Sequence, residues 1–193
     1  MRDALANGGN ANSLDGDGTS ALQFAVKYGH AEVVQVLLDS PELALNSRFQ
    51  FPYNGTPLQL AARYGNEKIV QLLINDQRVD VNITDKENNT PLHDAAKRGH
   101  NRIVVLLLNH PHIKANFKNK EGHTPLMSAL VRKMVDCMRD MLSHPKVDLD
   151  TVDVRAWGLN KVAKMIFNRL AFSFFYFGYS GDILLLTLKF MFS

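Results

Sequence analysis

The sequence predicts an all-α solenoid, in which helix-turn-helix units stack in a row and hairpin-like loops protrude between them. Two observations predict it. Four segments of the chain align with one another, and they begin at Ser20, Thr56, Thr90 and Thr124. An asparagine precedes each segment in a matching phase, at Asn12, Asn46, Asn82 and Asn116. A period of 34 to 36 residues is typical of repeat proteins whose units bury their apolar faces against each other.

Each unit carries its own helix boundaries. The starting Thr or Ser can cap a helix, because its hydroxyl accepts a backbone N–H. Proline follows at the first helical position, where no N–H is missed, at Pro57, Pro91 and Pro125. Glycine, which adopts φ > 0 and so ends a helix, follows at Gly29, Gly65 and Gly99. Apolar residues at helical spacing, such as Ile69, Val70, Leu72 and Leu73, then predict a second helix.

The third segment reads Thr90-Pro91-Leu92-His93-Asp94-Ala95, which matches the T-P-L-H-x-A pattern of ankyrin repeats. Residues 1–153 therefore resemble the ankyrin-repeat family, with repeats that start near residues 12, 46, 82 and 116 and a partial unit from residue 150. The resemblance implies an ankyrin-repeat solenoid that serves as a non-catalytic protein–protein interaction module or adaptor. Such arrays bind a protein partner on the concave face and the hairpin tips. We expect a monomer in the cytoplasm or nucleus.

The partner surface is expected on two features. Long basic and aromatic side chains recur at two positions near the end of the first helices: Lys27, Tyr28, Arg63, Tyr64, Lys97 and Arg98. The loops add Lys118 and Lys120, and the loop with two extra residues carries Phe49, Phe51 and Tyr53. Exposed aromatic clusters are typical of binding hot spots. The alternative is that these three rings fold onto the adjacent repeat.

Charge is distributed unevenly along the chain. Residues 1–53 hold three Lys or Arg against six Asp or Glu, whereas residues 91–144 hold nine against four. The basic later repeats favour an acidic protein partner, although a purely solubilising role is the alternative. Nucleic acid is not expected, because no nucleic-acid motif accompanies the basic residues.

The sequence gives no indication of catalysis, a cofactor or a metal. His30, His93 and His100 occupy repeat positions, where we expect hydrogen bonds between neighbouring repeats. The single Cys137 lies on a predicted helix with no identifiable base beside it, and no zinc or nucleotide motif is present. The VDVN run places Asn82 at a position that resembles the asparagine modified by an oxygen-dependent hydroxylase in many ankyrin arrays.

The repeat pattern weakens towards both ends. Residues 2–6 resemble the last turn of a second helix, and Lys133 replaces the turn glycine in the fourth repeat. Residues 154–193 form a divergent aromatic and apolar tail. Three interpretations of residues 166–193 stay open: a non-homologous end from alternative splicing or a gene-model error, a cap folded over the last repeat, and a membrane anchor.

The anchor would span residues 170–192, which is long enough to cross a bilayer. Its apolar residues favour insertion by about 5 kcal/mol, and Asp182 opposes insertion by about 3 kcal/mol. A membrane-tethered ankyrin protein is therefore one alternative function. The regulatory fragment of a longer enzyme or channel is another.

Overall fold

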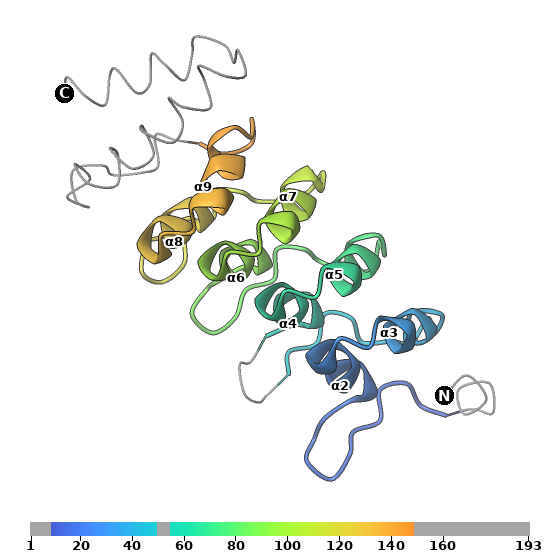
Figure 1. Ribbon diagram of the computed structural model, residues 1–193. Helices are drawn as coiled ribbons and strands as arrows, with labels where there is room; N and C mark the ends of the chain where they lie inside the picture. The colour runs from blue at the N-terminus through green and yellow to red at the C-terminus, as the bar shows by residue number, and fades with distance from the viewer. Residues whose placement is uncertain (1–8, 50–54, 149–193) are drawn as a thin grey trace, which may run out of the picture. The chain divides into compact units, whose positions relative to one another are not determined.

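The computed structural model describes residues 9–49 and 55–148. The chain separates into two units, Met1–Thr151 and Val152–Ser193, and every described residue belongs to the first. The described residues form eight helices in four pairs (Figure 1): α2 (Ala21–Tyr28) and α3 (Ala31–Leu38), α4 (Pro57–Tyr64) and α5 (Glu67–Ile74), α6 (Pro91–Arg98) and α7 (Asn101–Asn109), α8 (Pro125–Arg132) and α9 (Val135–Leu142). The predicted all-α repeat fold is confirmed.

The first helix of each pair begins and ends where the sequence predicts. The Thr56 hydroxyl accepts the Gln59 backbone N–H at 3.3 Å, and the Gln59 side chain accepts the Thr56 N–H at 2.8 Å, which forms a capping box. At the other end Gly65 has φ of 79°. Lys133 takes the same left-handed conformation, with φ of 60°, without being glycine. The fourth repeat therefore keeps the helix end at a backbone cost.

Small and branched residues bring the pairs together. The first helices α2, α4, α6 and α8 form one row and the second helices another, as Figure 1 shows. Alanines that are fully buried allow the first helices to approach closely, at Ala61, Ala62, Ala95 and Ala96. The second helices bury Ile69, Val70 and Leu73, and their equivalents in the next repeat, Ile103, Val104 and Leu107. The core is therefore continuous along the stack.

The repeating asparagines link neighbouring repeats. The Asn46 amide donates to the Arg78 carbonyl at 2.7 Å and accepts the Asp80 N–H at 2.9 Å. Asn82 makes the equivalent pair of bonds with His112 and Lys114, both at 2.8 Å. Since each asparagine satisfies two backbone groups one repeat further on, its periodicity has a structural cause.

The protruding loops are tight hairpins. In the third repeat the Asp85 N–H donates to the Asn89 carbonyl at 2.9 Å, and the Asn88 N–H donates to the Asp85 carbonyl at 3.0 Å. Asn88 has φ of 60°, where Gly18 and Gly122 stand in other hairpins with φ of 74° and 77°. The predicted hairpin-like loops are thus confirmed over the described part of the chain.

Several expectations fall outside the described residues. They are the anchor over residues 170–192, the tail and the partial fifth unit, residues 2–6, and the side chains of Phe51 and Tyr53. Within residues 9–49 and 55–148, no helix has the length and apolar character needed to cross a membrane.

Candidate functional site

An exposed stripe crosses the row of first helices. The last helical residue is exposed in all four repeats, and we call these residues the end stripe: Tyr28, Tyr64, Arg98 and Arg132. Tyr28 is 55% exposed and Tyr64 is 39% exposed. The four residues occupy equivalent positions in successive repeats. Their side chains are aromatic in the first two repeats and basic in the last two.

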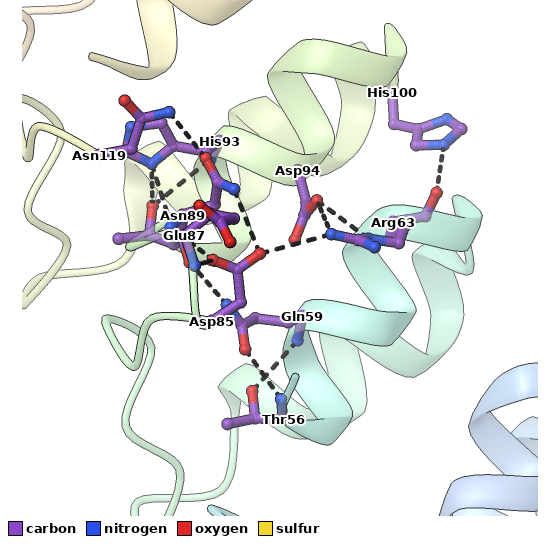
Figure 2. Close-up of polar contacts among 11 residues, drawn as sticks. Thr56, Gln59, Arg63, Asp85, Glu87, Asn89, His93, Asp94, His100 and Asn119 are labelled. Atoms are coloured by element: carbon purple, nitrogen blue, oxygen red, sulfur yellow. Dashed lines mark hydrogen bonds and ion pairs between the residues drawn. The ribbon is translucent and has the colours of Figure 1, made fainter. Parts of the chain in front are cut away.

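Hydrogen bonds between repeats fix the register of this stripe. The Asn66 amide donates to the Val26 carbonyl at 2.7 Å. In the next repeat, His100 Nε2 lies 3.2 Å from the Arg63 carbonyl, as Figure 2 shows. A Cβ added at Gly65 would come within 2.7 Å of the His100 ring. The helix ends therefore lie in close contact, and the end stripe is carried on a rigid support.

The first repeat adds an aromatic cluster at one end of the stripe. The Phe24 and Tyr28 ring centroids are 4.5 Å apart, and the His30 ring lies 6.3 Å and 6.4 Å from them. Lys27 Nζ lies 5.2 Å from the Tyr28 centroid, within the range of a cation–π contact. Phe24 is 51% exposed, and sequence reasoning missed it. At its equivalents, Leu60, Asp94 and Ser128, the side chains are buried.

Arg63 does not lie free on this face. Its side chain is only 14% exposed, and its Nη2 lies 2.9 Å from Asp94 Oδ1 and 3.5 Å from Asp85 Oδ2. Figure 2 shows the guanidinium turned towards these carboxylates of the next repeat. Arg63 thus joins two repeats, because Asp94 stands where the uncharged residues Phe24, Leu60 and Ser128 lie in the other repeats. A contact between Arg63 and a partner stays a prediction. Lys27 and Arg98 are exposed, and Lys97 is half-buried.

Buried polar side chains extend this network to the hairpins (Figure 2). Gln59 donates to the Asn89 carbonyl at 2.7 Å, and the Asn89 amide donates to Asp85 at 3.2 Å. Asn119 donates to Asn89 Oδ1 at 2.9 Å and accepts the His123 N–H at 2.9 Å. Three successive repeats are thereby connected through their hairpins, at the beginnings of the first helices.

Burial shifts two pKa values in this region. Burial lowers the pKa of His93 to about 4, so the ring is neutral near pH 7. Its Nδ1 then accepts the Thr90 N–H at 3.1 Å, and its Nε2 donates to the His123 carbonyl at 3.0 Å. Burial raises the pKa of Asp94 to about 6, although Arg63 acts in the opposite direction. The expected inter-repeat bonds of His93 and His100 are confirmed.

The hairpin residues differ in their exposure. Phe49 is buried, with only 7% of its surface exposed, so the expectation of an exposed ring at this position is wrong. Its N–H donates to the Gly55 carbonyl at 3.0 Å, which closes the base of the loop. Lys118 and Lys120 are exposed, and the Lys120 N–H donates to the Glu87 carbonyl of the neighbouring hairpin at 3.0 Å.

Other reactive groups are engaged or buried. Asn82 is half-buried, and both ends of its amide are hydrogen bonded. Burial raises the pKa of the Cys137 thiol to about 11, so it stays protonated near neutral pH. Within the part of the chain that the structure describes, no three His, Cys, Asp or Glu side chains are grouped to hold a metal ion.

A sequence profile of one family, described as ankyrin repeats (3 copies), matches residues 2–85 and 77–153. Together the two matches cover most of the 193-residue chain and include every described residue. No curated protein matches the chain.

Proposed function

Because this chain belongs to the ankyrin-repeat family, whose repeats are generally protein-binding and usually non-catalytic modules, we propose that it is an adaptor that binds a protein partner along the first-helix face. The observation that carries the proposal is the end stripe, Tyr28, Tyr64, Arg98 and Arg132, which is exposed in all four repeats. Tyr and Arg are the residue types enriched in binding hot spots. The hairpin tips contribute Lys118 and Lys120.

The rigidity of the support favours binding. A partner that docks on mobile side chains loses affinity to the entropy of ordering them. Here the helix ends are joined by Asn66 and His100, and the hairpins at the beginnings of the first helices by Asn89 and Asn119. The backbone that carries the end stripe is therefore held in place before a partner arrives.

The charge of the surface favours an acidic partner. Among the described residues, no ion pair involves Arg98, Arg132, Lys118 or Lys120. No described carboxylate lies within ion-pair distance of these cations, whereas Asp94 pairs with Arg63. Carboxylates placed opposite them gain both affinity and association rate, and the gain falls as salt is added.

Affinity capture with three versions of the full chain tests the proposal. The first is the wild type, the second carries Tyr28→Ala, Tyr64→Ala and Arg98→Ala, and the third carries Gln71→Ala and Val105→Ala. The last two residues are exposed on the second helices, so they form a matched control. A protein that the wild type and the control retain, and the first-helix variant loses, supports the proposal. Equal retention by all three contradicts it, provided circular dichroism shows that each is folded.

A further inference from the structure

The end stripe has a direction. Its first two members, Tyr28 and Tyr64, are aromatic, and its last two, Arg98 and Arg132, are basic. Phe24 enlarges the aromatic end, since its ring lies 4.5 Å from that of Tyr28 and is 51% exposed. The fixed register between repeats means that a ligand laid along the stripe meets these chemistries in a set order.

The charge of the hairpin tips also changes along the stack, from negative at the first repeat to positive at the fourth. The tip beside the first repeat carries Asp15 and Asp17, both exposed. The tip before the fourth carries exposed Lys118 and Lys120 and one exposed carboxylate, Glu121, so its charge is net positive. Lys27 is basic but lies at the aromatic end, where its Nζ is 5.2 Å from the Tyr28 ring centroid. Negative charge on a ligand is therefore opposed at one end of the stack and attracted at the other.

We propose that the partner contributes an extended peptide segment with an apolar or aromatic side chain at one end, against Phe24, Tyr28 and Tyr64, and carboxylates at the other, against Arg98, Arg132 and Lys120. The inference rests on the proposed protein-binding function and adds the chemistry of the bound segment. The exposed rings match an apolar anchor. The cations, which form no ion pair with a described residue, match carboxylates.

The length of the segment follows from the stack. Packed helices lie about 8–10 Å apart, so the three steps from Tyr28 to Arg132 cover roughly 27 Å. An extended chain rises about 3.3 Å per residue, so roughly eight residues span the stripe. The anchor and the carboxylates are therefore separated by about three residues of the partner for one step, from Tyr64 to Arg98, and by about eight for three steps, from Tyr28 to Arg132.

A basic surface with tyrosines can also attract single-stranded nucleic acid, by stacking and phosphate contacts. Every nucleotide carries a negative charge, however, and Asp15 and Asp17 stand at the aromatic end. A peptide can carry all its negative charges at the end that contacts Arg98 and Arg132 and none at the end that contacts Tyr28. A peptide therefore fits better than a nucleic acid.

A random library of displayed 12-residue peptides, selected on the immobilised full chain, tests the proposal. Enriched peptides should carry an aromatic or large aliphatic residue at one end and Asp or Glu at the other. Tyr28→Ala and Arg132→Ala should each weaken the best peptide about tenfold in fluorescence anisotropy, a size typical of hot-spot residues. The control Gln71→Ala should leave the affinity unchanged.

A second peptide, in which Gln replaces each Glu and Asp, shows which residues of the end stripe contact the carboxylates of the peptide. The effect of Arg132→Ala should vanish with this peptide, while the effect of Tyr28→Ala should persist, because only the arginine loses its ligand group. Loss of both effects, or of neither, would overturn the inference.

The remaining outcomes separate the two proposals. Peptides that need the end stripe but lack the two-ended pattern overturn the inference and leave the proposed function standing. Both proposals are contradicted if no selected peptide depends on the end stripe and if the variant with Tyr28→Ala, Tyr64→Ala and Arg98→Ala captures the same cell proteins as the wild type. Binding of a 15-residue oligothymidine as tightly as the best peptide, with the same dependence on Tyr28, overturns the choice of a peptide.

Discussion

Replacing His93 with glutamine should remove a pH-sensitive group from the core while keeping the fold. The second repeat already has glutamine at the equivalent position. Gln59 forms a capping box with Thr56 and donates to the Asn89 carbonyl at 2.7 Å, and His93 donates in the same way to the His123 carbonyl at 3.0 Å. His93→Gln is therefore expected to retain both hydrogen bonds and to change mainly the titration of the core.

The magnitude follows from the pKa of His93, which burial lowers from 6.5 to about 4. Because the folded pKa lies below the unfolded one, the stability that depends on neutral His93 is fully present above pH 6.5. It is lost as the pH falls through 6.5 towards 4. At 1.36 kcal/mol per pKa unit, the loss is roughly 3 kcal/mol. Relative to the wild type, His93→Gln should gain about this amount of stability between pH 7 and pH 4.

The neighbouring Asp94 titrates in the opposite sense. Burial raises its pKa from 3.8 to about 6, so its contribution to stability is fully present below pH 3.8 and is lost as the pH rises through 6. Between pH 4 and 6 the two groups offset each other in the wild type. Asp94 is present in both the wild type and His93→Gln, so its effect on stability cancels when the two are compared. The effect of His93 is therefore the difference between their free energies of unfolding at each pH.

Urea unfolding followed by circular dichroism, at several pH values from 4 to 7.5, gives that difference. Gln71→Ala serves as the control, because it changes an exposed side chain that carries no titratable group, and its difference from the wild type should not change with pH. A constant difference between His93→Gln and the wild type across this range would refute the reasoning about burial.

Three further substitutions test the repeat contacts by thermal or urea unfolding. Gly65→Ala should destabilise the fold by about 2 kcal/mol or more, because φ is +79° and the new Cβ would lie 2.7 Å from the His100 ring. Gly16→Ala is the control and should be nearly neutral, because a Cβ at Gly16 would have no atom within 4 Å. Lys133→Gly should stabilise by about 1 kcal/mol, because φ is 60° there, and a loss would contradict the strain. Asn82→Ala should cost about 1–3 kcal/mol through two orphaned backbone groups, and an unchanged stability would show that water replaces them.

Local signals were sufficient to predict the helices. Thr56, Pro57 and Gly65 act on their own repeat, through a cap, a fixed φ and a left-handed turn, so their effect is visible in the sequence. The phase of the asparagines was visible too. Its cause was not, because the carbonyl that Asn46 binds belongs to Arg78, 32 residues away.

The candidate surface was predicted only in part, because exposure depends on the next repeat. Arg63 is equivalent to exposed Lys27, yet Asp94 in the following repeat draws it into a buried ion pair. Asp94 differs from Phe24, Leu60 and Ser128 at its position, and this could have signalled the pairing. For Phe49 the sequence left an exposed ring and a folded-in ring as alternatives, and the structure shows the ring buried. Neither result follows from the period of the repeat alone.

Site-specific photo-cross-linking in cells tests the central claim, that the first-helix face binds a protein. A photoreactive phenylalanine analogue is placed at Tyr64 in one full-length chain and at Gln71 in another, since both positions are exposed in one repeat on different helices. The account predicts a cross-linked protein adduct from position 64 and none from position 71. Adducts from position 71 alone, or from neither position, would contradict it.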